Sequence, residues 1–261
     1  MIGVQTQPVG NLLRKWRERR RLSQLDLACE AEISTRHLSF LETGRSAPSR
    51  EMVLRLAEYL DVPLRERNAL LIAAGYAPAF PERPLDDPAL QSARKAVDLV
   101  LAGHEPYPAI AIDRHWTLIA SNNAVATFLA GAEPSLLRAP VNVLRLSLHP
   151  AGLAPRIANL AQWRSHLLAR LRRQIEVTAD PVLEELLNEL CGYPAPGEGA
   201  GDNEEYAGVA VPFQLVTERG VLSFISATTI FGTPVDITLS ELALESFFPA
   251  DAATAIALRG F

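Results

Sequence analysis

Residues 23–44 read SQLDLACEAEISTRHLSFLETG, and this stretch decides the fold of the first part of the chain. A helix-turn-helix packs two helices at a sharp angle, so apolar residues must recur at fixed offsets and a small residue must lie where the helices touch. The residues at the apolar offsets are Leu27, Ala31, Ile33, Leu38 and Leu41, and the small residue is Ala28. The pattern predicts a helix-turn-helix at residues 24–41.

The sequence on both sides of this motif carries signals for helix ends. The residues that can cap helix starts are Ser23, with Asp26 at the capping-box position, Ser34 and Ser49. Gly44 lies where a helix end favours the left-handed conformation, and Glu32 lies in the turn, where glycine is usual because the backbone takes positive φ. Apolar residues at helical spacing continue through residues 10–75, so we expect an all-α domain of about five helices.

The second helix of such a motif enters the major groove of DNA, where exposed side chains near its N-terminus meet base edges. The residues predicted to contact bases are Thr35, Arg36, Ser39 and Phe40, and those predicted to contact phosphates are Gln24, Ser34 and Arg45. Arg36 can donate two hydrogen bonds to guanine, while Phe40 and the Thr35 methyl group can pack on a thymine methyl group. The alternative is a structural bundle of four or five helices whose polar face binds nothing.

The charge of the chain is unevenly distributed. The formal net charge is −5, yet residues 10–67 hold 12 Lys and Arg residues against nine Asp and Glu residues. A run of basic residues in the first predicted helix comprises Arg14, Lys15, Arg17, Arg19, Arg20 and Arg21. This run either contacts phosphates or forms a solvated helix face, and its charge alone favours the solvated face.

A proline-rich stretch, Tyr76–Pro88, divides the chain. Four prolines within 11 residues prevent a continuous helix and favour a stiff, extended segment. We therefore expect a DNA-binding domain at residues 1–75, a linker at 76–88 and a second domain at 89–261.

The second domain shows both helix and strand patterns. The expected helices are Ala89–Ala102, Asn122–Leu129, Pro155–Thr178 and Pro181–Leu190. The expected strands are Ala109–Ile112, Thr117–Ala120, Val209–Val216, Val221–Phe231 and Val235–Leu239. Pro194–Glu205 is rich in proline, glycine and acidic residues and predicts a mobile loop. The second domain is therefore expected to be α+β, and the protein multidomain.

Several classes of protein are disfavoured. No stretch approaches the ~18–20 apolar residues needed to cross a bilayer, and no secretory signal opens the chain, so we expect a cytoplasmic location. Cys29 and Cys191 are the only cysteines, too few for a disulfide framework. Catalytic motifs and metal-ligand spacings are not found in the sequence, so neither an enzyme, a cofactor nor a metal site is expected.

The run from Leu22-Ser23-Gln24 to Leu41-Glu42-Thr43-Gly44 resembles the XRE class of helix-turn-helix domains, which are phage-repressor-like. Further phrases resemble the MmyB-like regulators: Leu64-Arg65-Glu66-Arg67-Asn68, Ala74-Gly75-Tyr76, Asp113-Arg114-His115-Trp116, Val143-Leu144-Arg145-Leu146-Ser147-Leu148-His149-Pro150 and Phe247-Phe248-Pro249-Ala250-Asp251. The resemblance implies a lambda-repressor-like domain, then a PAS-like domain with helices over one sheet face. It further implies a bacterial one-component regulator that binds palindromic operators as a homodimer and senses a small molecule.

A PAS-like sheet that holds a ligand needs a concave apolar face closed by helices. The candidate ligand-binding residues are Phe213, Phe224 and Phe231 on strands, Trp116, Leu144, Leu148, Trp163 and Leu167 on the closing side, and Arg145, His149 and His166 as polar anchors. A run of arginines that includes Arg170 is expected to form a solvated helix face. The predicted ligand is small and apolar, like a fatty acid or a lactone. The alternative is a filled core that serves dimerisation or protein interaction without a ligand.

Overall fold

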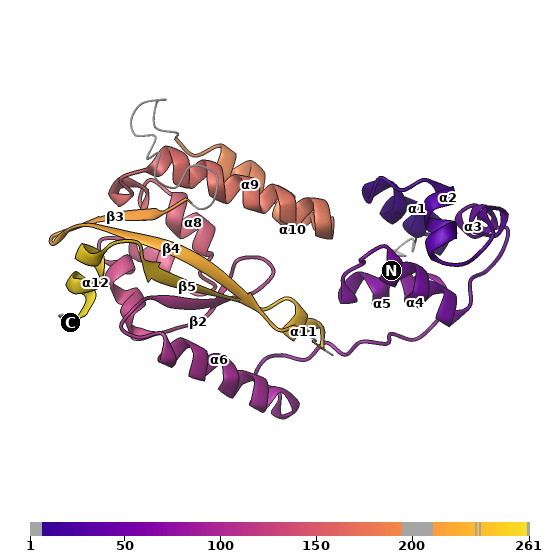
Figure 1. Ribbon diagram of the computed structural model, residues 1–261, viewed down its shortest axis with the longest axis horizontal. Coiled ribbons are helices and arrows are strands. Elements are labelled where there is room, and N and C mark those ends of the chain that lie inside the picture. The colour runs from indigo at the N-terminus through magenta and orange to yellow at the C-terminus, as the bar shows by residue number, and fades with distance from the viewer. Residues whose placement is uncertain (1–6, 195–210, 233, 235, 260–261) are drawn as a thin grey trace. The chain divides into compact units, whose positions relative to one another are not determined.

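The computed structural model describes residues 7–194, 211–232, 234 and 236–259, and the chain divides into two compact units (Figure 1). The first unit comprises the chain up to Arg83 together with Pro234–Ser240. The second unit comprises Pro84–Thr233 and Glu241–Phe261. Pro234–Ser240 therefore belongs to the first unit, although the chain before and after this segment belongs to the second unit.

The first unit contains five helices before the proline-rich stretch: α1 (Val9–Arg19), α2 (Gln24–Glu30), α3 (Thr35–Glu42), α4 (Arg50–Tyr59) and α5 (Leu64–Ala73). The predicted helix-turn-helix corresponds to α2 and α3. Its offset residues Leu27, Ala28, Ala31, Leu38 and Leu41 are all buried in the core, and Ile33 packs against it. The apolar spacing therefore correctly predicted how these two helices meet.

The helix ends in the first unit also follow the predicted local chemistry. Ser23 and Asp26 form a reciprocal capping box, with N···O distances of 3.1 and 2.9 Å. The Ser34 hydroxyl oxygen accepts the His37 amide at 3.1 Å, and Ser49 caps α4 in the same way. Gly44 has φ +73° and Glu32 has φ 52°. Glu32 thus adopts the left-handed backbone that glycine takes at lower cost.

The expected strand Val235–Leu239 is wrong, because its described part forms the short helix α11 (Ile237–Ser240). Asp236 starts this helix by accepting the Thr238 amide at 2.9 Å, as aspartate does at helix N-termini. The fully buried Asp236 carboxylate also pairs with Arg83 at 3.1 Å, and the Ile237 amide donates to the Pro81 carbonyl. Contacts with residues far away in the sequence therefore override the alternating apolar pattern, which favours a strand.

The second unit is built on a five-stranded antiparallel sheet in the order β2-β1-β5-β4-β3. The strands are β1 (Ala109–Ile112), β2 (Leu118–Ser121), β3 (Phe213–Thr217), β4 (Gly220–Ile230) and β5 (Ala243–Pro249). The central strand β5 was not predicted. Both sheet faces are covered at this position, so the strand lacks the alternation of apolar and polar residues that marks a strand open to solvent on one side.

Helices lie against both faces of the sheet (Figure 1). They are α6 (Gln91–Gly103), α7 (Ala126–Leu129), α8 (Val143–Leu148), α9 (Leu160–Thr178), α10 (Pro181–Cys191) and α12 (Ala252–Arg259). On strand β1, Ala109 and Ala111 pack in a small cluster with residues of α6, whereas Ile110 and Ile112 join the main core with α8, α9 and α10. The side-chain alternation of one strand thus serves two hydrophobic cores.

The remaining boundaries depart from the prediction in detail. The expected helix Ala89–Ala102 is a single 3₁₀ turn (η1, Pro88–Leu90) followed by α6, and the expected helix Pro155–Thr178 is interrupted before α9. The interruption has a tertiary cause, because Ile157 forms an isolated β-bridge with Leu215. Helices α8 and α12 were not predicted. Of the expected loop Pro194–Glu205, only Pro194 lies within the described residues.

Candidate functional site: helix α3 and an apolar cavity

Helix α3 presents one side to solvent and the other to the core. Leu38 and Leu41 are buried, while Arg36 is exposed and Thr35, Ser39 and Phe40 are half-buried. The four residues outside the core recur at the spacing that places side chains on one helical face. The predicted base-contacting residues therefore lie together on the outer face of α3.

Two guanidinium groups flank the Phe40 ring on this face. The Arg36 Cζ atom lies 5.3 Å from the ring centroid, and the Arg45 Cζ atom lies 5.9 Å from it. Cation–π contacts of this kind hold long side chains near an aromatic face. The outer face of α3 therefore combines positive charge, hydrogen-bond donors and an apolar ring within a few ångströms.

The three predicted phosphate-contacting residues differ in how they are engaged. Arg45 is exposed. Ser34 uses its hydroxyl oxygen as an acceptor in the helix cap, which leaves the hydroxyl proton as a donor. Gln24 donates its side-chain amide to Glu42 Oε2 at 2.8 Å and has a second amide proton available. All three can still donate to an anion.

A buried ion pair holds α3 against α1. Arg17 Nε lies 2.6 Å from Glu42 Oε1, and Arg17 Nη2 lies 3.0 Å from Glu42 Oε2. Side-chain exposure is 10% for Arg17 and 2% for Glu42. The hydrogen bond to Glu42 raises the pKa of Arg17. The expectation that the whole basic run faces solvent or phosphate is thus wrong for Arg17, and Arg20 also donates to the Leu60 and Asp61 carbonyls.

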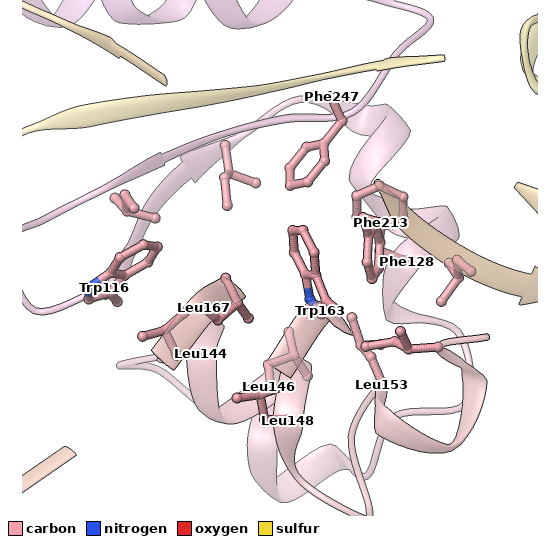
Figure 2. Packing of buried hydrophobic residues seen from close by; sticks show 14 of the residues in the cluster. Trp116, Phe128, Leu144, Leu146, Leu148, Leu153, Trp163, Leu167, Phe213 and Phe247 are labelled. Atoms are coloured by element: carbon pink, nitrogen blue, oxygen red, sulfur yellow. The ribbon is translucent and has the colours of Figure 1, made fainter. Parts of the chain in front are cut away.

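The second unit contains a cavity of about 90 Å³ between the sheet and the helices that cover it. Its apolar wall includes Trp116, Phe128, Leu144, Trp163, Leu167, Phe213 and Phe247. Figure 2 shows Trp163 pointing from its helix towards Phe247 on the sheet, with Trp116 and Leu144 farther along the same layer. A mostly apolar, partly enclosed space of this kind suits an apolar ligand.

Four phenylalanines form one end of the cavity region. The ring of Phe128, on α7, lies edge-on to Phe213, Phe224 and Phe247, with a centroid separation of 5.2 Å from each. The tilted ring of Trp163 lies 5.0 Å from Phe213. Edge-to-face pairs at these distances are favourable beyond the area that they bury. Phe128 therefore ties α7 to three strands of the sheet.

A charged pair lies in the cavity wall. Arg170 on α9 forms an ion pair with Glu245 on β5, and both residues bond to the Thr228 hydroxyl, at 2.8 and 2.9 Å respectively. The Arg170 guanidinium also lies 4.7 Å from the Trp116 ring centroid. The expectation that Arg170 forms part of a solvated face is wrong, because its side chain turns inward to a partner from the sheet.

Trp116 is held in a strained backbone conformation. Its φ is 64°, a left-handed value that costs a non-glycine residue roughly 1–3 kcal/mol. The indole Nε1 donates to Gln174 Oε1 at 2.8 Å, and Gln174 in turn donates to the Arg114 carbonyl. Contacts from α9 therefore fix a side chain that the turn between β1 and β2 presents to the cavity.

The structure brings together five of the eleven predicted ligand-binding residues. Those that line the cavity are Trp116, Leu144, Trp163, Leu167 and Phe213, and Arg170, Glu245, Phe128 and Phe247 join them without having been predicted. Leu148 and Phe224 lie in the same core but not in the cavity wall, and Phe231 packs in the separate cluster with residues of α6. Glu245 and Phe247 are two residues apart on β5, so they lie on the same face of the strand. Had the sequence predicted a strand here, this spacing would have placed both residues on one side of the sheet.

The predicted polar anchors lie outside the described cavity wall. Arg145 pairs with Glu189 at 2.7 Å, and burial together with the hydrogen bond to Glu189 raises the pKa of Tyr193 to about 12. The His149 ring accepts the Ala151 amide. His166 stacks on Trp163 with a centroid separation of 5.5 Å, and its pKa is lowered by burial and then by nearby arginines. These three side chains have structural partners of their own.

Among the described residues, no group of three or more His, Cys, Asp or Glu side chains is placed to hold a metal ion. None of the helices resolved in these ranges combines the length and apolar character that a bilayer-crossing helix requires.

Comparison with known proteins gives two family matches. A family model described as the MmyB-like transcription regulator ligand binding domain matches residues 93–260, and a helix-turn-helix domain model matches residues 8–70. A protein of Methanoculleus marisnigri, whose name places it among HTH-type transcriptional regulatory proteins, is 32% identical over 123 residues. The match covers 45% of this chain and 39% of that protein.

One solved structure is also similar in sequence. It is the clp gene regulator ClgR from Corynebacterium glutamicum, which is 26% identical and matches over 39% of this chain and 94% of its own. The TM-score is 0.24, too low to indicate a shared architecture. The family models, which together span most of the chain, carry the comparison.

Proposed function

Because the chain belongs to the MmyB-like transcription regulators, with a helix-turn-helix domain and a ligand-binding domain, we propose that it is a one-component sensor. In this proposal a homodimer binds a palindromic operator through two α3 helices, and a small apolar ligand in the cavity shifts the affinity for DNA. Such a regulator would act in the cytoplasm, on the nucleoid.

The observation that carries the DNA part of the proposal is the outer face of α3, where Thr35, Arg36, Ser39 and Phe40 lie together. A recognition helix reads bases with side chains near its N-terminus, and Arg36 follows directly after the first helical residue. In a dimer, the two α3 helices would contact half-sites about 34 Å apart, or a multiple of this distance. Each half-site would then be read by the same four side chains.

We expect Arg36→Ala to weaken operator binding by about 5- to 150-fold, or ~1–3 kcal/mol, and to relax base preference at one position in each half-site. The measurement is fluorescence anisotropy with an operator selected in vitro by the wild-type protein.

Arg45→Ala should instead weaken binding to all sequences and reduce the dependence of affinity on salt concentration. Arg138→Ala, an exposed arginine of the second unit, is the control. A folded Arg36→Ala protein with unchanged affinity and base preference would show that the recognition face is misassigned.

The observation that carries the ligand part is the cavity of about 90 Å³ lined by aromatic and aliphatic side chains. Protein cores are close-packed, so an apolar space large enough for several atoms is unusual in a domain that serves only as a scaffold. The strained Trp116 at its wall also fits a functional site, because backbone strain concentrates where ligands bind.

We expect the purified protein to carry a small apolar molecule, detectable by native mass spectrometry and identified after denaturing extraction. Leu167→Trp should abolish this mass increment because it fills the cavity, whereas Leu99→Trp, at a position that is 73% exposed, should retain it. A dimer of wild-type protein that carries nothing and takes up no added apolar compound would favour a ligand-free dimerisation module instead.

A further inference from the structure

We propose that the cavity selects a neutral ligand, an apolar chain that ends in a hydroxyl, ketone or lactone group, over a free carboxylate of the same length. The inference rests on the proposed ligand-binding function of this cavity. It concerns the polar end of the cavity wall, formed by Arg170, Glu245 and Ser226, together with Thr228, which bonds to both charged side chains.

The positive charge at this end is already neutralised. Among the described residues in the cavity wall, Arg170 is the single cationic side chain and Glu245 the single anionic one. They form an ion pair in which Glu245 is 5% exposed and Arg170 25% exposed. The Thr228 hydroxyl lies between them, bonding to Arg170 at 2.8 Å and to Glu245 at 2.9 Å. The sheet holds this arrangement in register, since Thr228 on β4 is the direct cross-strand partner of Glu245 on β5.

A ligand carboxylate at this end would compete with the Glu245 carboxylate for one guanidinium group. Like charges that share a buried site disfavour ionisation of one of them, by a pKa unit or more. No second cation offsets this, because His166 lies outside the described cavity wall and burial lowers its pKa. Arg173 on the same helix is exposed. A free acid would therefore have to displace Glu245 or bind protonated.

A neutral oxygen meets no such penalty. Arg170 bonds to Glu245 and Thr228 through Nη2, and a guanidinium group carries five N–H donors. A carbonyl or lactone oxygen can accept from the other nitrogens, and a hydroxyl group can also bond to Ser226, which lines the cavity. The charge balance of the wall stays at zero, so the ion pair remains intact.

The test compares two short probes of equal carbon number, γ-hexalactone and hexanoate, titrated into the full-length protein at pH 7.5. Trp116 and Trp163 line the cavity, so their fluorescence reports binding, with isothermal calorimetry as the second measurement. We expect wild-type protein to bind the lactone at least about tenfold more tightly than the acid, the factor that corresponds to one pKa unit.

Glu245→Gln tests the cause of the preference, because it removes the competing carboxylate and keeps the side-chain shape. We expect hexanoate to gain at least about tenfold in affinity while the lactone changes little. Glu184→Gln removes the same charge from an exposed position of α10 and should leave both affinities unchanged. Thermal unfolding checks that each variant is folded. If Glu245→Gln protein is unfolded, the ratio of lactone to acid affinity in the wild-type protein still tests the preference for a neutral group.

The outcomes separate this inference from the proposed function. Wild-type protein that binds hexanoate as tightly as the lactone overturns the selection of a neutral group but supports a ligand cavity. An unchanged preference in folded Glu245→Gln protein overturns the role of the ion pair. Binding of neither probe, in a protein that also purifies without a bound molecule, overturns both.

Discussion

Glu42→Ala is expected to destabilise the first unit by about 3–5 kcal/mol, because it leaves the Arg17 guanidinium buried without its carboxylate partner. Arg17 makes two hydrogen bonds to Glu42 and a third to the Leu22 carbonyl at 2.8 Å, so it cannot reach water without moving α1. The Gln24 amide loses its partner as well. The stability is read from the urea dependence of hydrogen exchange in α1 and α3, measured by mass spectrometry on the full-length protein, since two units need not unfold together.

Glu18→Ala is the matched control for this prediction. Glu18 pairs with Arg14 at 2.8 Å and lies 4.0 Å from Arg17 Nη2, but the side chains of Glu18 and Arg14 are both more than half exposed. Exposed pairs contribute little because water and salt screen them, so exchange in α1 should not change measurably. Replacing both partners by Arg17→Met and Glu42→Leu should recover most of the lost stability, since no charge is then left buried. Equal behaviour of Glu42→Ala and Glu18→Ala would contradict a structural role for the buried pair.

Phe128→Ala is expected to lower the stability of the second unit by about 3–5 kcal/mol, through lost burial and the space left behind. The ring is 6% exposed and contacts three other phenylalanine rings, so its removal separates α7 from the sheet. The measurement is hydrogen exchange in β4 and β5 under the same conditions. Phe128→Leu should cost much less because it retains most of the volume.

Phe248→Ala serves as the control for Phe128→Ala, because it removes the same side chain from β5 at a position that is 46% exposed. Its ring contacts the edge of His104 but takes no part in the phenylalanine cluster around Phe128. We expect a clearly smaller loss. If both substitutions cost the same, the packing around Phe128 does not account for the cohesion of α7 with the sheet.

The first unit could be predicted from sequence almost completely. Its signals are local: apolar offsets from Leu27 to Leu41, serine caps at helix starts and a glycine after α3. Each acts within about four residues, the span of a helical hydrogen bond, so the local sequence carries the information. The same local chemistry also predicted the exposed face of α3, because the core offsets fix which side of the helix remains outside.

Charged side chains in helices were harder to assign. Arg17 and Arg170 each lie in arginine-rich runs that look like solvated faces, yet both turn to buried glutamates from distant segments. Arg17 does follow Leu13 and Trp16 at spacings of four and one, on the buried side of α1, which is a local hint. No comparable hint exists for Arg170, since its partner Glu245 lies 75 residues away.

The sequence by itself determined the five-helix unit, the helix-turn-helix register and the outer face of α3, because helices and their caps depend on near neighbours. Only the tertiary structure revealed the strand β5, the place of Pro234–Ser240 in the first unit and the charged end of the cavity. Strand pairing joins residues far apart in sequence, and the register that places Glu245 opposite Thr228 exists only once β4 and β5 meet. A buried charge is stable where such a partner is present, and no local pattern records that partner.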